Sequence, residues 1–82
     1  MELNETIKGM TSDDYKERFK AEYNQLIIRY NKLNDVIKKY CDGTLEFTLS
    51  CDILLLLDQR AVMGSYKAIL EHRASIEGIE LN

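Results

Sequence analysis

Apolar residues recur along the first half of the chain with the spacing of a coiled-coil seam. Two interleaved series of aromatic and aliphatic side chains, each repeating every seven residues, run from residue 19 to residue 40. This pattern predicts a long amphipathic helix over residues 11–41. Thr11 followed by Asp14 is typical of a capping box at its start. The seam consists of Phe19, Tyr23, Leu26, Tyr30, Leu33, Ile37 and Tyr40.

A second helix is predicted over residues 50–77, with Ser50 as its N-cap and Gly78 as its end. Its helically spaced positions are Leu56, Met63, Tyr66, Leu70, Arg73 and Glu77. The connection, residues 42–49, alternates apolar and polar side chains, which allows a short extended piece. Two helices of similar length with a short connection form an antiparallel hairpin. We therefore expect one all-α domain over residues 1–82, with a short N-terminal segment over residues 1–10.

The hairpin carries more apolar surface than two helices can cover. A domain of this size buries only about 60% of the surface of its unfolded chain. Cys41 and Cys51 are the only cysteines, and we interpret them as small packing residues in a reducing compartment. The surplus therefore predicts a homo-oligomer. The surplus residues are Ile27, Ile28, Val36, Ile53, Leu55, Leu57, Val62 and Ile69.

The net charge of the chain argues against DNA as a partner. The chain is acidic, with a formal net charge of −3, whereas a DNA-binding protein is usually basic. Residues 29–40 form a basic segment that contains Lys38 and Lys39. It is either a solvated helix end, favoured by the helix dipole, or a site for a compact anion. The longest apolar run, Ile53 to Leu57, is too short to span a membrane, and residues 1–10 lack the apolar stretch of a signal peptide. We expect a cytoplasmic protein.

Motifs for catalysis are weak. His72 is the only histidine, and the chain has neither a phosphate-binding glycine loop nor metal-ligand spacing. We therefore expect a protein that is not an enzyme and has no cofactor. The tyrosines leave two alternatives. Each either packs at an interface with its hydroxyl in water, or forms a platform on which a nucleotide base stacks.

Two runs of residues resemble a known family. The first is Arg18-Phe19-x-x-Glu22-Tyr23-x-x-Leu26-x-x-Arg29-x-x-Lys32-Leu33-x-x-Val36-Ile37. The second is Leu56-x-x-Gln59-x-x-x-Met63-x-x-Tyr66-x-x-Ile69-Leu70-x-x-Arg73-Ala74-x-Ile76-Glu77. Over residues 15–81 the chain is similar to the small helical phage proteins of the anti-CBASS cyclic-oligonucleotide sponge family (anti-CBASS two).

The resemblance implies a compact hexamer in the cytoplasm of an infected bacterium. It implies that the protein sequesters cyclic dinucleotides, and in a second class of pocket cyclic trinucleotides, without cleaving them, and so blocks CBASS-type defence. Tyr23 matches a base-stacking tyrosine, and Lys38 or Lys39 a phosphate-binding lysine. Arg73 is the candidate contact for a trinucleotide phosphate. The connection over residues 44–51 departs from the family pattern, which leaves the choice of nucleotide open, including a cyclic ADP-ribose isomer.

The spacing of the candidate residues and the apolar surplus each bear on function without the resemblance. Tyr23 and Lys38 are 15 positions apart, or about 22 Å along a helix, so one chain cannot place both on one cyclic dinucleotide. The apolar surplus also fits a different class of function. A helical adaptor or inhibitor could use it to bind a protein, because Tyr, Met and Arg are enriched in protein interfaces.

Overall fold

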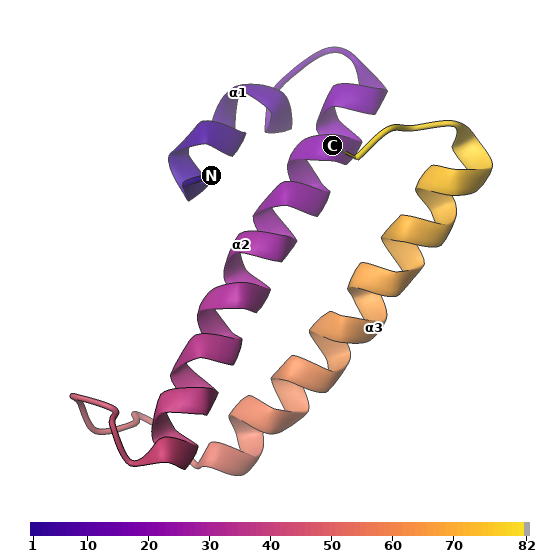
Figure 1. The fold of residues 1–82 in the computed structure, drawn as a ribbon. Helices are drawn as coiled ribbons and strands as arrows, with labels where there is room; N and C mark the ends of the chain where they lie inside the picture. The colour runs from indigo at the N-terminus through magenta and orange to yellow at the C-terminus, as the bar shows by residue number, and fades with distance from the viewer. Residues whose placement is uncertain (82) are drawn as a thin grey trace.

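The computed structural model describes residues 1–81, which fold as an antiparallel hairpin of two long helices with a short helical segment at the N-terminus (Figure 1). The long helices are α2 (Tyr15–Asp42) and α3 (Ile53–Glu77). The N-terminal segment consists of the 3-10 helix η1 (Leu3–Thr6) and α1 (Ile7–Met10), and it packs on α2. The all-helical class is thus confirmed. Asn82, the last residue of the predicted domain, lies outside the described residues.

The predicted start of the first long helix was wrong. Asp14, not Thr11, caps α2, because its carboxylate accepts a hydrogen bond of 2.9 Å from the backbone N–H of Lys16. Thr11 instead donates its hydroxyl to the carbonyl of Ile7 at the end of α1. The capping-box spacing was present, but the preceding short helix uses the threonine.

The start of the second helix was also predicted too early. Asp52 caps α3 by accepting a hydrogen bond of 2.8 Å from the backbone N–H of Leu54. Ser50 therefore lies in the connection, which runs from Gly43 to Asp52 and forms no strand within the described chain. An aspartate and a serine two positions apart are both good caps, and the spacing alone did not choose between them.

Glycines end both long helices in the left-handed conformation, with φ of 76° at Gly43 and 69° at Gly78. After α2, the N–H of Thr44 donates to the carbonyl of Lys39 and the N–H of Gly43 to that of Tyr40, which is a Schellman motif. After α3, the N–H of Ile79 donates to the carbonyl of Ala74. This turn brings Ile79 into the core, and Gly78 ends the helix as predicted.

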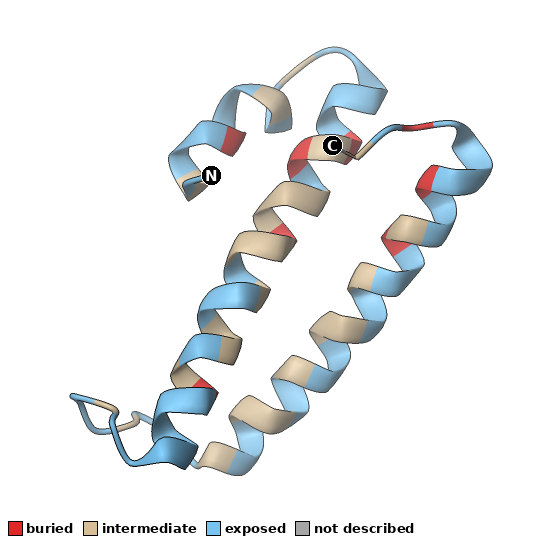
Figure 2. Ribbon diagram, viewed as in Figure 1, coloured by how far each residue is buried: buried red, intermediate tan, exposed pale blue. Residues whose placement is uncertain are grey.

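The core lies at one end of the hairpin, where α2 begins and α3 ends (Figure 2). Leu70 at its centre has no exposed surface. Half-buried Tyr23, Met63 and Leu81 pack around this cluster. Towards the connection, only Ile37 of α2 is buried. The cluster consists of Phe19, Leu26, Leu70, Ala74 and Ile79.

Much of α3 remains uncovered. Its side away from α2 is exposed along the whole helix (Figure 2). Surplus residues Leu55, Val62 and Ile69 are each more than half exposed, whereas Ile27 and Ile28 of α2 are only partly exposed. None of the described helices is long and apolar enough to cross a membrane.

The N-terminal segment contacts α2 through a glycine. A Cβ added at Gly9 would lie 2.9 Å from the Cβ of Ala21, closer than side-chain packing allows, and Ala21 is buried on α2. At Gly64 of α3 an added Cβ meets only the side chain of Tyr30, at 3.3 Å from its hydroxyl.

We expect Gly9→Ala to lower the free energy of unfolding by about 1–3 kcal/mol, because it overpacks the contact with Ala21. Gly64→Ala is the matched control. There the tyrosine tip can shift and alanine favours the helix by about 0.5–1 kcal/mol, so we expect little loss. Urea denaturation of both variants measures the difference. Equal stability of the two variants would show that the Gly9 contact is not tight.

Candidate functional site

Three tyrosine–glutamate pairs join α2 to α3. Tyr15 donates its hydroxyl to Glu77 at 2.7 Å, and Tyr23 donates to Glu71 at 2.6 Å. In the third pair the tyrosine is on α3, where Tyr66 donates to Glu22 of α2. From the Tyr15–Glu77 pair to the Tyr23–Glu71 pair, the partner moves back along α3 as the tyrosine moves forward along α2, as an antiparallel register requires. These bonds satisfy the phenol hydroxyls with the chain's own carboxylates.

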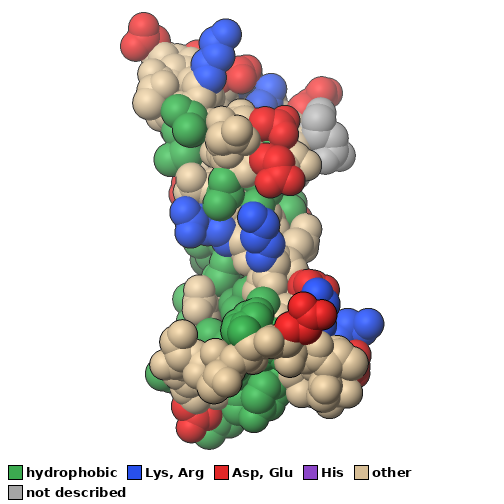
Figure 3. Space-filling view, turned by 90° about the vertical axis from the view of Figure 1, so that its left-hand side faces the viewer, with side chains coloured by type: hydrophobic (Ala, Val, Ile, Leu, Met, Phe, Trp, Pro, Cys, Tyr) green, Lys and Arg blue, Asp and Glu red, His purple; other side chains and the backbone are tan. Residues whose placement is uncertain are grey.

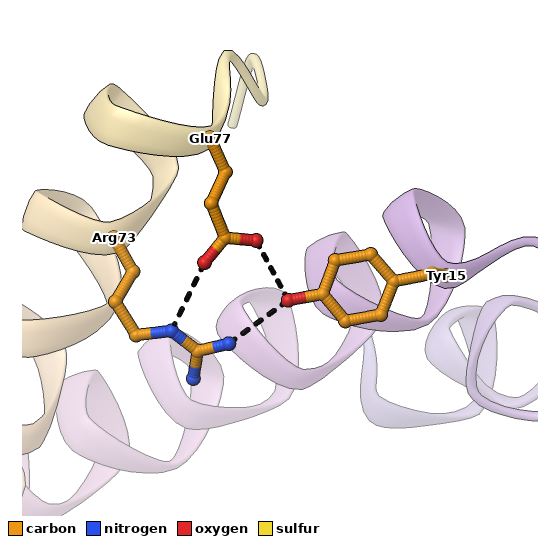
Figure 4. A network of polar contacts seen from close by, with 3 residues as sticks. All are labelled: Tyr15, Arg73 and Glu77. Atoms are coloured by element: carbon orange, nitrogen blue, oxygen red, sulfur yellow. Dashed lines mark hydrogen bonds and ion pairs between the residues drawn. The ribbon is translucent and has the colours of Figure 1, made fainter.

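Arg73 lies in a polar network at the end of the hairpin where α2 begins and α3 ends, which we call the open end. Figure 4 shows this network. Its Nε donates to Glu77 at 3.3 Å and its Nη2 donates to the Tyr15 hydroxyl at 2.9 Å. The guanidinium also lies 5.0 Å from the centre of the Phe19 ring, within the range of a cation–π contact. The hydrogen bonds from Tyr15 and Arg73 lower the pKa of Glu77. Arg73 is therefore an exposed cation that already pairs with Glu77.

Tyr23 lies on α2 between the core residues Phe19 and Leu26, about one helical turn from each. Its ring is half-buried against the core cluster, and its partner Glu71 also pairs with Lys67 at 3.0 Å. Burial, together with the hydrogen bond to Glu71, raises the pKa of Tyr23 to about 12. The bond from Tyr23, with that from Lys67, lowers the pKa of Glu71. Within one chain, Tyr23 thus packs between the helices and has its hydroxyl paired.

Lys38 and Lys39 lie at the other end of α2. Lys38 is the more exposed, with 78% of its side chain accessible and Asp42 at 4.0 Å. Lys39 pairs with Asp35 at 3.1 Å. Such exposed pairs are worth little free energy, so a phosphate can displace the carboxylates. Because α2 is unbroken, about 22 Å of helix separates Tyr23 from Lys38. Arg73 lies at the Tyr23 end of the hairpin.

A groove of about 730 Å³ lies between the N-terminal segment and α2. Its charged lining consists of Glu5, Asp13 and Glu17 beside Lys8 and Lys20. This lining is not predominantly basic, so it does not favour a ligand with two phosphates. The size is suitable for a small molecule, but the charge is not suitable for a cyclic dinucleotide.

A second, smaller groove of about 320 Å³ continues along the outer side of α2. Ile27 and Ile28 supply apolar surface there, and Lys32 supplies a cation. Figure 3 shows this side of the molecule, with Lys and Arg side chains gathered between the N-terminal segment and the connection and hydrophobic side chains beside them. The cations of the basic segment predicted from the sequence are all exposed, namely Arg29, Lys32, Lys38 and Lys39.

The structure places the other candidate groups at the surface. Cys41 and Cys51 are both exposed near the connection, so their interpretation as packing residues was wrong, because they flank the turn outside the core. Across residues 1–81, no three His, Cys, Asp or Glu side chains are grouped to bind a metal ion.

Sequence reasoning missed the glutamate partners of the tyrosines. Glu22, Glu71 and Glu77 are ordinary surface residues in the helical pattern, and each becomes specific only in the hairpin register. The predicted antiparallel hairpin could have indicated one of these pairs. It places the start of the first long helix beside the end of the second, where Tyr15 meets Glu77.

The fold thus defines a small helical hairpin whose polar groups lie at its surface. A model of the family described as Sequestin matches residues 13–76, which include all of α2 and nearly all of α3. The chain belongs to the Sequestin family. This match confirms the prediction of a sequestering, sponge-type family. Comparisons with curated proteins and with solved structures gave no match.

The paired phenol of Tyr23 predicts a dependence of stability on alkaline pH. Its pKa is about 12 in the folded protein and 10 ordinarily, so it stabilises the fold fully below about pH 10 and progressively less as the pH rises through about 12. We expect the free energy of unfolding to fall over this range, and to fall less in Tyr23→Phe. Tyr40→Phe is the control, because Tyr40 is 46% exposed. Urea denaturation at several pH values measures the slopes, and identical slopes in both variants would contradict the assignment.

Proposed function

We propose that this protein sequesters cyclic oligonucleotide second messengers, cyclic dinucleotides first and cyclic trinucleotides in addition, without cleaving them. The observation that carries this proposal is membership of the Sequestin family over residues 13–76. In this proposal the protein is encoded by a phage, acts in the cytoplasm of the infected bacterium and blocks CBASS-type defence by removing the signal. Its working form is a homo-oligomer, which we propose to be a hexamer.

The surface chemistry supports an anionic ligand with flat bases. Exposed Lys38 and Lys39 supply cations at one end of the hairpin, and Tyr15, Tyr23 and Arg73 lie at the other. Aromatic rings stack on bases, and lysine or arginine binds phosphate. Each group has an intramolecular partner that a ligand would replace. For Lys38 and Lys39 this replacement costs little, because exposed ion pairs are weak.

The separation of these groups supports a pocket between copies of the chain. About 22 Å of helix lies between Tyr23 and Lys38, more than one cyclic dinucleotide spans. If both residues bind one ligand, they come from different copies. The groove at the N-terminal segment is a poor alternative within one chain, because its lining holds three carboxylates against two lysines.

One observation favours a second candidate function. The outer side of α3 exposes apolar side chains, and such a surface could instead bind another protein. In that case the chain would be a helical adaptor or inhibitor. The two candidates differ in whether nucleotide alone binds to the purified protein.

We expect purified protein to remove cyclic dinucleotide from solution and to release it chemically unchanged after proteolysis. Competition with a receptor needs a dissociation constant in the nanomolar range, or about −12 kcal/mol. Equilibrium dialysis followed by chromatography of the released nucleotide measures both quantities. Linear nucleotides are the control. Recovery of a cleaved product, or no depletion of any cyclic nucleotide, would contradict the proposal.

Point variants test the residues. Tyr23→Ala and Lys38→Ala should each weaken binding of a cyclic dinucleotide by about tenfold or more, since they remove a stacking ring and a charge-assisted hydrogen bond. Tyr23→Phe keeps the ring and should bind well. Lys16→Ala, at an exposed lysine in the first turn of α2, is the charge control, and Lys39→Ala shows which lysine is used. Unchanged binding in both Tyr23→Ala and Lys38→Ala would refute the assignment.

A further inference from the structure

The side of α3 that faces away from α2 is almost free of charge. Five large apolar residues on it are between 57% and 73% exposed, namely Leu54, Leu55, Val62, Ile69 and Ile76. Four of them, from Leu55 to Ile76, repeat every seven residues, as in a coiled coil. The charged side chains of α3 that contact α2, such as Glu71, lie on the inner side. A helix that is apolar on both sides is normally buried on both sides.

Small residues form a second stripe beside this apolar series. Ala61, Ser65, Ala68 and Ser75 are all exposed, and their spacing of three, four and seven residues keeps them on one face. Small side chains allow another helix to approach closely. The two stripes together form a face, which we call the outer face of α3, with large side chains on one flank and small ones on the other.

Only two titratable side chains, Asp58 and His72, lie in the middle of this face, and both are exposed. Neither Asp58 nor His72 takes part in any of the ion pairs found in the described part of the chain. They are spaced equally on either side of Ser65. Leu54 and Ile76, the ends of the face, are also spaced equally about Ser65.

We propose that the outer face of α3 binds the same face of a second copy of this chain, antiparallel, with a twofold axis at Ser65. In this arrangement Asp58 of each copy lies opposite His72 of the other. Val62 lies opposite Ala68, and Ile69 opposite Ala61, so that each large side chain meets a small one. A parallel pair would instead place Asp58 against Asp58 and His72 against His72, which electrostatics disfavours.

The pairing also bears on the proposed function, on which this step rests. Antiparallel helices place the connection end of one copy beside the open end of the other. The last turns of α2, with Lys38 and Lys39, lie beside the connection, and Tyr15 and Arg73 belong to the first turn of α2 and the last turns of α3 at the opposite end. Figure 1 shows these two ends of the hairpin. A pair of chains thus brings to each of its ends both groups of candidate ligand-binding residues, which one chain keeps apart.

Cross-linking tests the geometry in the absence of nucleotide. In a Cys41→Ser, Cys51→Ser background, Ser65→Cys should form a disulfide-linked dimer on mild oxidation, because the twofold axis places the two introduced thiols together. Ser75→Cys is the matched control. In an antiparallel pair its two copies are about 30 Å apart, so it should remain unlinked. Cross-linking of both variants would indicate a parallel pair, and cross-linking of neither would overturn the proposal.

Charge exchange supplies an independent check that does not need a disulfide. His72→Glu places a carboxylate against Asp58 of the partner at two points, and should weaken self-association by about tenfold or more. Adding Asp58→Lys should restore it. Light scattering gives the mass and circular dichroism verifies the helices. If His72→Glu leaves the mass unchanged, the pairing is wrong.

The interface and the proposed function can fail separately. A dimer that binds no cyclic dinucleotide would support this interface and refute the proposed function. A monomer that binds cyclic dinucleotide would refute this interface and support the proposed function.

Discussion

The constraint on which this molecule depends is that α3 is apolar on two sides, whereas the hairpin covers only one. The inner side packs around Leu70 and Ala74 in a small core at one end of the molecule. The outer side, from Leu54 to Ile76, has no partner within the described chain. Exposing this much apolar surface is unfavourable in water. In the homo-oligomer that we propose, further copies of the chain cover this surface, so that the stability of the hairpin depends on assembly.

Polar groups at the two ends of the hairpin differ in kind. At the open end, Tyr15 and Arg73 are tied to Glu77 in a network that holds α2 and α3 in register. At the connection end, Lys38 and Lys39 have only weak surface pairs. The same tyrosines and arginine that fix the register are also the candidate ligand-binding groups. We infer that binding and helix pairing share these residues, and that a ligand replaces intramolecular partners.

The sequence was most informative where periodicity and glycine decide the structure. The seam from Phe19 to Ile37 predicted the face of α2 that meets α3, and Gly78 predicted the end of α3. It was less informative at helix starts, where Asp14 and Asp52 compete with other good caps nearby. It did not reveal the tyrosine–glutamate pairs, because these depend on residues far apart in sequence that meet only in the folded register. The pattern does not determine the ligand-binding residues, since both packing and stacking use the same tyrosines.

Native mass spectrometry of the protein mixed with a cyclic dinucleotide tests whether the assembled chains sequester the nucleotide, because it reports the number of chains and the bound nucleotide in one particle. We expect an assembly with an even number of chains that carries nucleotide of unchanged mass. A monomer that carries nucleotide would contradict the shared site, and an assembly that carries none would contradict sequestration.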